Sequence, residues 1–149
     1  MKYLFHRSSS LHNNTDKIYN FTASENLKNP TTMILEDVVY RATTRADYLY
    51  PQTIYLRSDA LTTMLKENHT VEVKSDGSNR SSNIIGVLTQ TSFPGRYELR
   101  GKYRFKIDPH RTNKIFEFTF TDGDTRLDTI FTGSGTGYDS EFVITLEFN

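Results

Sequence analysis

An unbroken alternation of apolar and charged residues between Arg96 and Ile107 constrains the fold more than any other feature of the sequence. From Tyr97 onward every second residue is apolar or glycine, and the residues between them are charged. A period of two over this length is incompatible with a helix face and is typical of a strand. Gly101 occupies one of the apolar positions without contributing a side chain, and a glycine inside a strand pattern often marks a bend. We therefore predict two strands that meet at Gly101.

Similar alternation recurs along the chain, around Phe118 and through the C-terminal residues. The run from Ile84 to Leu88 is apolar on both faces, which predicts a central strand covered on both sides. The predicted strands are 18–22, 32–41, 53–58, 83–91, 96–100, 103–107, 114–121 and 141–148, and only 59–68 carries a helical signal. The predicted core is Ile54, Leu56, Ile85, Val87, Tyr103, Phe105, Phe116, Phe118, Phe120, Phe142, Ile144, Leu146 and Phe148. Strands without intervening helices predict an all-β sandwich or barrel.

The 149 residues fit one domain, predicted to span 17–149, preceded by a polar N-terminal strand or flexible arm over 1–16. The chain has no cysteine, which excludes disulfides and thiolate chemistry. The few apolar residues near the N-terminus do not resemble a signal peptide, and no later stretch is long enough to span a bilayer. We therefore expect synthesis in the cytosol, without secretion or membrane insertion.

The residues give little indication of catalysis. His6, His12, His69 and His110 do not have metal-ligand spacing, so solvated histidines are the simpler interpretation. Asp122, Asp124 and Asp128 resemble part of a calcium loop, but the full pattern with its closing glutamate is missing, so a hairpin turn explains Asp122-Gly123-Asp124 better. The glycines between 133 and 137 are followed by a strand, not by the helix that a phosphate-binding loop requires. We expect no enzymatic activity, cofactor or metal.

One charged feature is a candidate site. Between Arg96 and Lys114 lie seven of the 18 basic residues of a chain that is neutral as a whole. Four of them share one strand face and would form a positive stripe: Arg100, Lys102, Arg104 and Lys106. A solvated strand face is the first interpretation, a protein–protein interface the second and a nucleic-acid surface the last. Because no aromatic residues lie among these cations on their own strand face to stack on bases, we expect no specific nucleic acid.

Three segments occur in a characteristic order. A strand ending in Arg57-Ser58-Asp59 precedes the hydrophobic strand at 83–91, and a later strand leads into the turn Thr121-Asp122-Gly123-Asp124, followed by Leu127-Asp128. A short aliphatic strand ends the chain. This order resembles the penton and minor capsid proteins of adenovirus-like icosahedral DNA viruses, including virophages, polinton-like viruses and giant viruses. The resemblance covers 32–149; the segment before it matches no motif of that family.

The resemblance implies a single eight-stranded jelly roll, with two antiparallel four-stranded sheets packed face to face. It implies a virion structural protein, favoured as a homopentameric penton at a capsid vertex, that contacts the major capsid protein and other capsid proteins. Two alternatives stay open. One is a trimeric minor capsid protein or fibre head that binds a receptor or glycan, and the other is a jelly-roll enzyme of the cupin or glycosidase kind.

Overall fold

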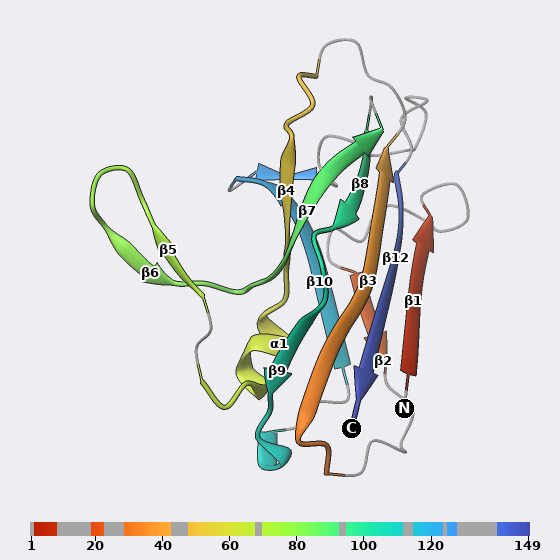
Figure 1. Ribbon diagram of the computed structural model, residues 1–149, viewed down its shortest axis with the longest axis vertical. Helices are drawn as coiled ribbons and strands as arrows, with labels where there is room; N and C mark the ends of the chain where they lie inside the picture. Colours follow the sequence, from red (N-terminus) through yellow and green to blue (C-terminus); the bar gives the residue numbers. More distant parts are fainter. Residues whose placement is uncertain are drawn as a thin grey trace.

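The computed structural model describes residues 2–8, 19–22, 29–42, 48–67, 70–92, 95–111, 115–123, 125–127 and 140–149. Most of these residues lie in strands, so the predicted all-β class is confirmed (Figure 1). The strands are β1 (Lys2–Ser8), β2 (Tyr19–Thr22), β3 (Thr32–Ala42), β4 (Thr53–Arg57), β5 (Val71–Val73), β6 (Asn79–Ser81), β7 (Ile84–Ser92), β8 (Arg96–Leu99), β9 (Tyr103–Lys106), β10 (Ile115–Asp122), β11 (Thr125–Arg126) and β12 (Ser140–Phe148). The short helix α1 (Asp59–Met64) follows β4, and the 3-10 turn η1 (Pro109–Arg111) follows β9.

Ten of the described strands form one continuous antiparallel sheet. Its order is β1-β12-β3-β8-β7-β4-β10-β11, with β9 also paired to β3 and β2 to β10. Strands β5 and β6 form a separate two-stranded sheet. The pairing is nested along the chain: β1 pairs with β12, β2 with β10, β3 with β8 and β9, and β4 with β7.

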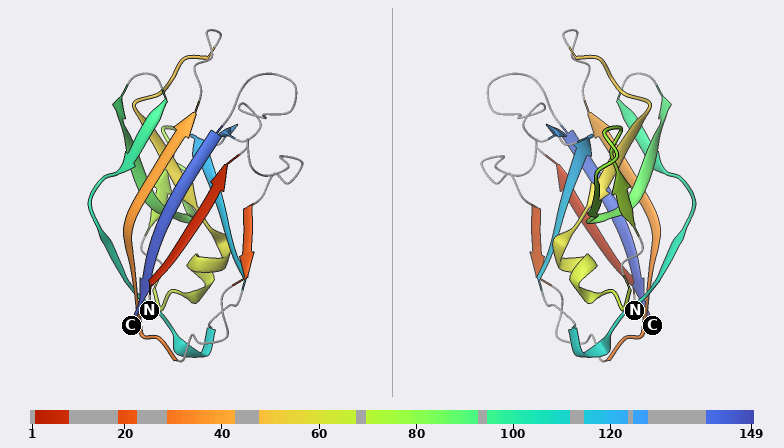
Figure 2. Two further views of the ribbon diagram at one scale, coloured as in Figure 1. Left: turned by 90° about the vertical axis from the view of Figure 1, so that its right-hand side faces the viewer. Right: turned by 90° about the vertical axis from the view of Figure 1, so that its left-hand side faces the viewer.

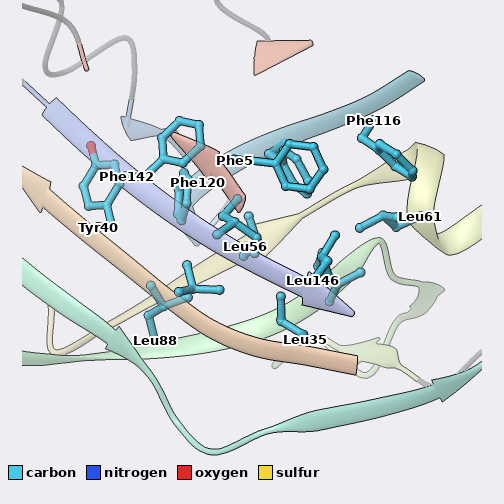
Figure 3. Packing of buried hydrophobic residues seen from close by; sticks show 14 of the residues in the cluster. Phe5, Leu35, Tyr40, Leu56, Leu61, Leu88, Phe116, Phe120, Phe142 and Leu146 are labelled. Atoms are coloured by element: carbon cyan, nitrogen blue, oxygen red, sulfur yellow. The ribbon is translucent and has the colours of Figure 1, made fainter. Parts of the chain in front are cut away.

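The long sheet curls around an aromatic core, as the two views of Figure 2 show. Phe5 of β1 lies across the core from β10, with its ring 5.1 Å from that of Phe118. Phe142 of β12 lies 5.1 Å from Phe120, also on β10. Strands from the two ends of the pairing order therefore pack face to face through their aromatic side chains (Figure 3).

The predicted strands agree closely with the described ones, and the helical signal at 59–68 corresponds to α1. At the N-terminus, Lys2–Ser8 is strand β1, paired with β12 over its full length, whereas residues 9–16 of the predicted arm lie outside the described residues. The β5–β6 hairpin was not predicted. Its strands are three residues long each, too short for periodicity to indicate them.

Most of the predicted core is buried, but the prediction for Val87 was wrong. Leu56 pairs with Gly86 while Arg57 pairs with Ile84, so Ile85 is an extra residue in β7. Such a β-bulge shifts the alternation by one position. Beyond it, Leu88 points into the core and Val87 is half-buried on the outer face. Tyr103 was also predicted in the core, and it is half-buried at the core margin.

Candidate functional site

The four cations of the predicted positive stripe all lie on the surface. Arg104 and Lys106 are exposed on β9, which pairs with the first half of β3. Arg100 and Lys102 are exposed in the bend between β8 and β9, on either side of Gly101. Gly101 has a φ of +87°, a backbone conformation that favours glycine, so the predicted bend is confirmed.

Acidic residues of the same sheet face lie beside this stripe. Glu36 on β3 is within 3.3 Å of the Lys2 ammonium of β1. A hydrogen bond shared with the Glu147 carboxyl lowers the pKa of Glu36, and the charges of Lys2 and Lys102 lower it further, against burial that raises it. The stripe therefore borders an acidic group of its own sheet at Lys102, whose charge is partly balanced within the molecule.

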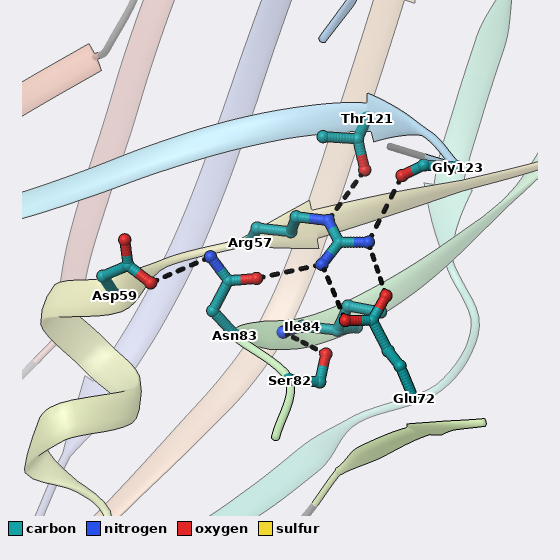
Figure 4. Close-up of polar contacts among 8 residues, drawn as sticks. All are labelled: Arg57, Asp59, Glu72, Ser82, Asn83, Ile84, Thr121 and Gly123. Atoms are coloured by element: carbon teal, nitrogen blue, oxygen red, sulfur yellow. Dashed lines mark hydrogen bonds and ion pairs between the residues drawn. The ribbon is translucent and has the colours of Figure 1, made fainter. Parts of the chain in front are cut away.

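A second polar cluster surrounds Arg57, the last residue of β4. Its side chain is only 9% exposed, and all five of its N–H donors are engaged (Figure 4). Nε donates to Thr121 Oγ1 at 3.0 Å. Nη1 donates to Asn83 Oδ1 at 3.0 Å and to Glu72 Oε2 at 3.3 Å. Nη2 donates to Glu72 Oε1 at 2.9 Å and to the Gly123 carbonyl at 3.2 Å.

The residues after Arg57 extend this network into helix α1. Ser58 is the helix N-cap, and its hydroxyl accepts a hydrogen bond from the Leu61 amide at 3.1 Å. Asp59 accepts one from the Asn83 side chain at 2.9 Å. Glu117 of β10 accepts from the Asp59 amide at 3.1 Å, which ties the start of the helix to the neighbouring strand.

The sequence segments that carry the family resemblance meet at this cluster. Arg57-Ser58-Asp59, Asn83 and the turn Thr121-Asp122-Gly123 are far apart in the sequence and are joined here by hydrogen bonds. The sequence alone identified these segments but predicted no role for Arg57. An arginine at a strand end is usually exposed, and no local pattern distinguishes the rare buried one.

Two tyrosines near Asp122, at the same end of β10, have perturbed pKa values. Tyr48 donates a hydrogen bond to Asp122 at 3.0 Å, and burial, followed by this bond, raises its pKa well above the ordinary value of 10.0. Tyr97 donates to the Pro51 carbonyl at 2.6 Å, and burial raises its pKa in the same direction. Asp122 thus accepts a hydrogen bond from a tyrosine, while Asp124 and Asp128 of the considered calcium loop lie outside the described residues.

These shifts predict how the protein responds to alkali. In the unfolded chain both phenols titrate near pH 10.0, whereas in the folded chain they stay protonated at higher pH. Their contribution to stability is therefore complete below pH 10 and is lost as the pH rises above it. An alkaline titration followed by phenolate absorbance and circular dichroism should show these tyrosines ionising only as the fold is lost, and Tyr48→Phe should remove one phenolate from that late phase. Ionisation of all nine tyrosines near pH 10 in a folded chain would contradict this assignment.

The other residues considered for metal or phosphate binding do not form a site within the described part of the chain. Within them, no three histidine, aspartate or glutamate side chains are grouped as metal ligands. His6 lies 3.3 Å from Glu141, His110 is exposed in η1, and His12 and His69 lie outside the described part of the chain. So do the glycines between 133 and 137.

Two cavities lie near the β5–β6 hairpin. A cavity of about 680 Å³ is lined mainly by polar side chains of α1, of the segments flanking the hairpin and of η1. A second, of about 390 Å³, lies between β5 and the outer face of β4 and β7. Arg57 and Glu72 line this second cavity together with apolar residues.

No known protein family and no curated protein matches the chain. Among the described residues, no helix is both long enough and apolar enough to be a membrane span.

Proposed function

We propose that this protein is a single jelly-roll virion structural protein, and that its activity is self-assembly into a penton-like ring. The nested antiparallel pairing supports this proposal: the first strand pairs with the last, and each inner pair follows in turn. A chain folded back on itself as one long hairpin and then rolled up has this pattern, which is how a jelly roll forms its two sheets. The order of the sequence segments described above supports the penton over other jelly-roll proteins.

Assembly requires surfaces that recognise another copy. A cyclic ring needs two different complementary patches on each copy. The exposed stripe of Arg100, Lys102, Arg104 and Lys106 is the proposed basic patch, and acidic surface elsewhere on the next copy is its proposed partner. In the virion, the remaining surface would contact the major capsid protein and other capsid proteins. The proposal assigns the protein no catalytic activity and no cofactor.

Charge reversal in the stripe tests this assignment. The double variant Arg104→Glu, Lys106→Glu places like charges against the acidic patch of the next copy, and we expect it to weaken self-association by about tenfold or more. The measurement is light scattering across a concentration series. Because both side chains are exposed on β9, the fold should be unaffected.

The matched control is Arg41→Glu, Lys66→Glu, which reverses two exposed cations outside the stripe. This control should associate like the wild type. Equal association of both double variants and the wild type would remove the stripe from the interface.

A further inference from the structure

The β5–β6 hairpin stands apart from the rest of the fold. Among the described strands, β5 and β6 pair only with each other, with Val71 opposite Ser81 and Val73 opposite Asn79. Figure 1 shows the hairpin projecting outward from the side of the sheet where β4 and β7 lie. A two-stranded hairpin is at most marginally stable by itself in water. Contacts with the curled ten-stranded sheet, called the barrel below, must therefore hold the hairpin in place.

Hydrophobic burial contributes little to holding it. Val71 is 56% exposed and Val73 is 74% exposed. Glu72 lies between the two valines and is much less exposed than they are. Its side chain points the opposite way because successive side chains of a strand alternate. The two valines are therefore mostly exposed, although both border the cavity beside β4 and β7, and the glutamate points toward the main sheet.

Glu72 holds the hairpin to the barrel by a two-pronged ion pair with Arg57. Both carboxylate oxygens accept hydrogen bonds, at 2.9 and 3.3 Å, and the Glu72 side chain is 16% exposed. Thr121, Asn83 and Gly123 already fix the guanidinium in the barrel. The Glu72 carboxylate therefore binds a guanidinium whose orientation is already fixed. The ion pair is for this reason geometrically specific as well as strong.

The hairpin lies over an apolar strip of the sheet. The cavity of about 390 Å³ beneath β5 is lined on the barrel side by Tyr55 of β4 and by Ile84 and Val87 of β7. The sequence of β7 is apolar on both faces, which is typical of a strand covered on both sides. The core covers the inner face, and on the outer face β5 borders this strip, whose three side chains are half-buried.

We infer that the β5–β6 hairpin is a strap, latched beside the outer face of β4 and β7 by the Arg57–Glu72 ion pair. The strap opens as a unit while the barrel stays folded, and opening exposes the strip of Tyr55, Ile84 and Val87. Local opening of this kind is expected where an element has few buried apolar contacts and no backbone ladder to the main sheet.

Hydrogen exchange followed by mass spectrometry on the full chain tests the strap. The variant Glu72→Gln removes the charge from the latch, and Glu67→Gln is the matched control, an exposed glutamate between α1 and β5. In Glu72→Gln, amides of 71–81 should exchange about tenfold faster or more, while peptides of β3 and β12 stay close to the wild type. Glu67→Gln should match the wild type throughout. The inference is overturned if the hairpin amides do not accelerate, or if hairpin and barrel accelerate together.

A second measurement reports the covered strip directly. The chain has no cysteine, so Val87→Cys introduces a single thiol beneath the strap. Its alkylation rate should rise about tenfold when Glu72→Gln is added and should stay unchanged when Glu67→Gln is added. Equal rates in all three backgrounds would mean that Glu72 does not hold a cover over this strip.

Discussion

Replacing Arg57 with methionine should lower the free energy of unfolding by about 3 kcal/mol. Methionine fills much of the same space but donates no hydrogen bond. Removing the guanidinium leaves the Glu72 carboxylate without its cation, and it leaves the acceptors on Thr121, Asn83 and Gly123 without their donor. The acceptors on Thr121, Asn83 and Gly123 stay in place when the hairpin opens, so losing their buried donor costs more than the hydrogen bonds themselves contribute. Urea unfolding of the purified variant measures the loss.

The matched control is Arg104→Met, the same change at an exposed arginine on β9. It should alter the free energy of unfolding by no more than about 0.5 kcal/mol. If both variants lose the same small amount, Arg57 is not the centre of a stabilising network. The two results together separate the loss of a buried network from the general effect of removing an arginine.

The core gives the other large effect. Phe116→Ala should lower the free energy of unfolding by about 3–5 kcal/mol, since it removes a fully buried ring and leaves a cavity. Phe116 packs against Phe5 at 5.7 Å and Phe148 at 5.8 Å, so its loss weakens contacts between β10 and both β1 and β12. These are contacts across the curl of the sheet.

Its neighbour on β10 is the control. Ile115 is 59% exposed, and Ile115→Ala should cost about 1 kcal/mol or less. Both changes shorten an apolar side chain on the same strand, so β-propensity alone cannot explain a large difference between them. Similar losses at 115 and 116, again from urea unfolding, would contradict the described orientation of β10.

Much of the fold follows from side-chain periodicity alone. The alternating runs of β9, β10 and β12 identify both the strands and the faces they bury, because a half-buried strand needs one apolar face. The bend at Gly101 and the turn at Gly123 follow from residues that tolerate positive φ. The burial of Phe116, Phe118 and Phe120 could be predicted for the same reason.

The features that escaped prediction depend on tertiary context. Val87 points outward because a bulge at Ile85 shifts the alternation, and nothing in the local sequence distinguishes the bulge from regular strand. For β1, the sequence left both a strand and a flexible arm open over 1–16, because the exposed Leu4, 68% accessible, hides the alternation of Tyr3 and Phe5.

The basic stripe and the Arg57 cluster also differ in how well the sequence predicts them. The stripe from Arg100 to Lys106 could be read from the sequence because its spacing is local. The Arg57 cluster could not, because Arg57 and its partners come from four separate segments that only the fold brings together. Periodicity therefore predicts exposed linear features well and buried long-range polar contacts poorly.

Self-assembly is the central claim, and native mass spectrometry of the full chain over a range of concentrations tests it most directly. The proposed function predicts a closed homopentamer that becomes the dominant species as the concentration rises, with no larger open series, since a ring satisfies both patches of every copy. A closed trimer would contradict the penton assignment and favour the fibre-head or other minor capsid alternative. A monomer that persists at every concentration would contradict assembly by this chain alone.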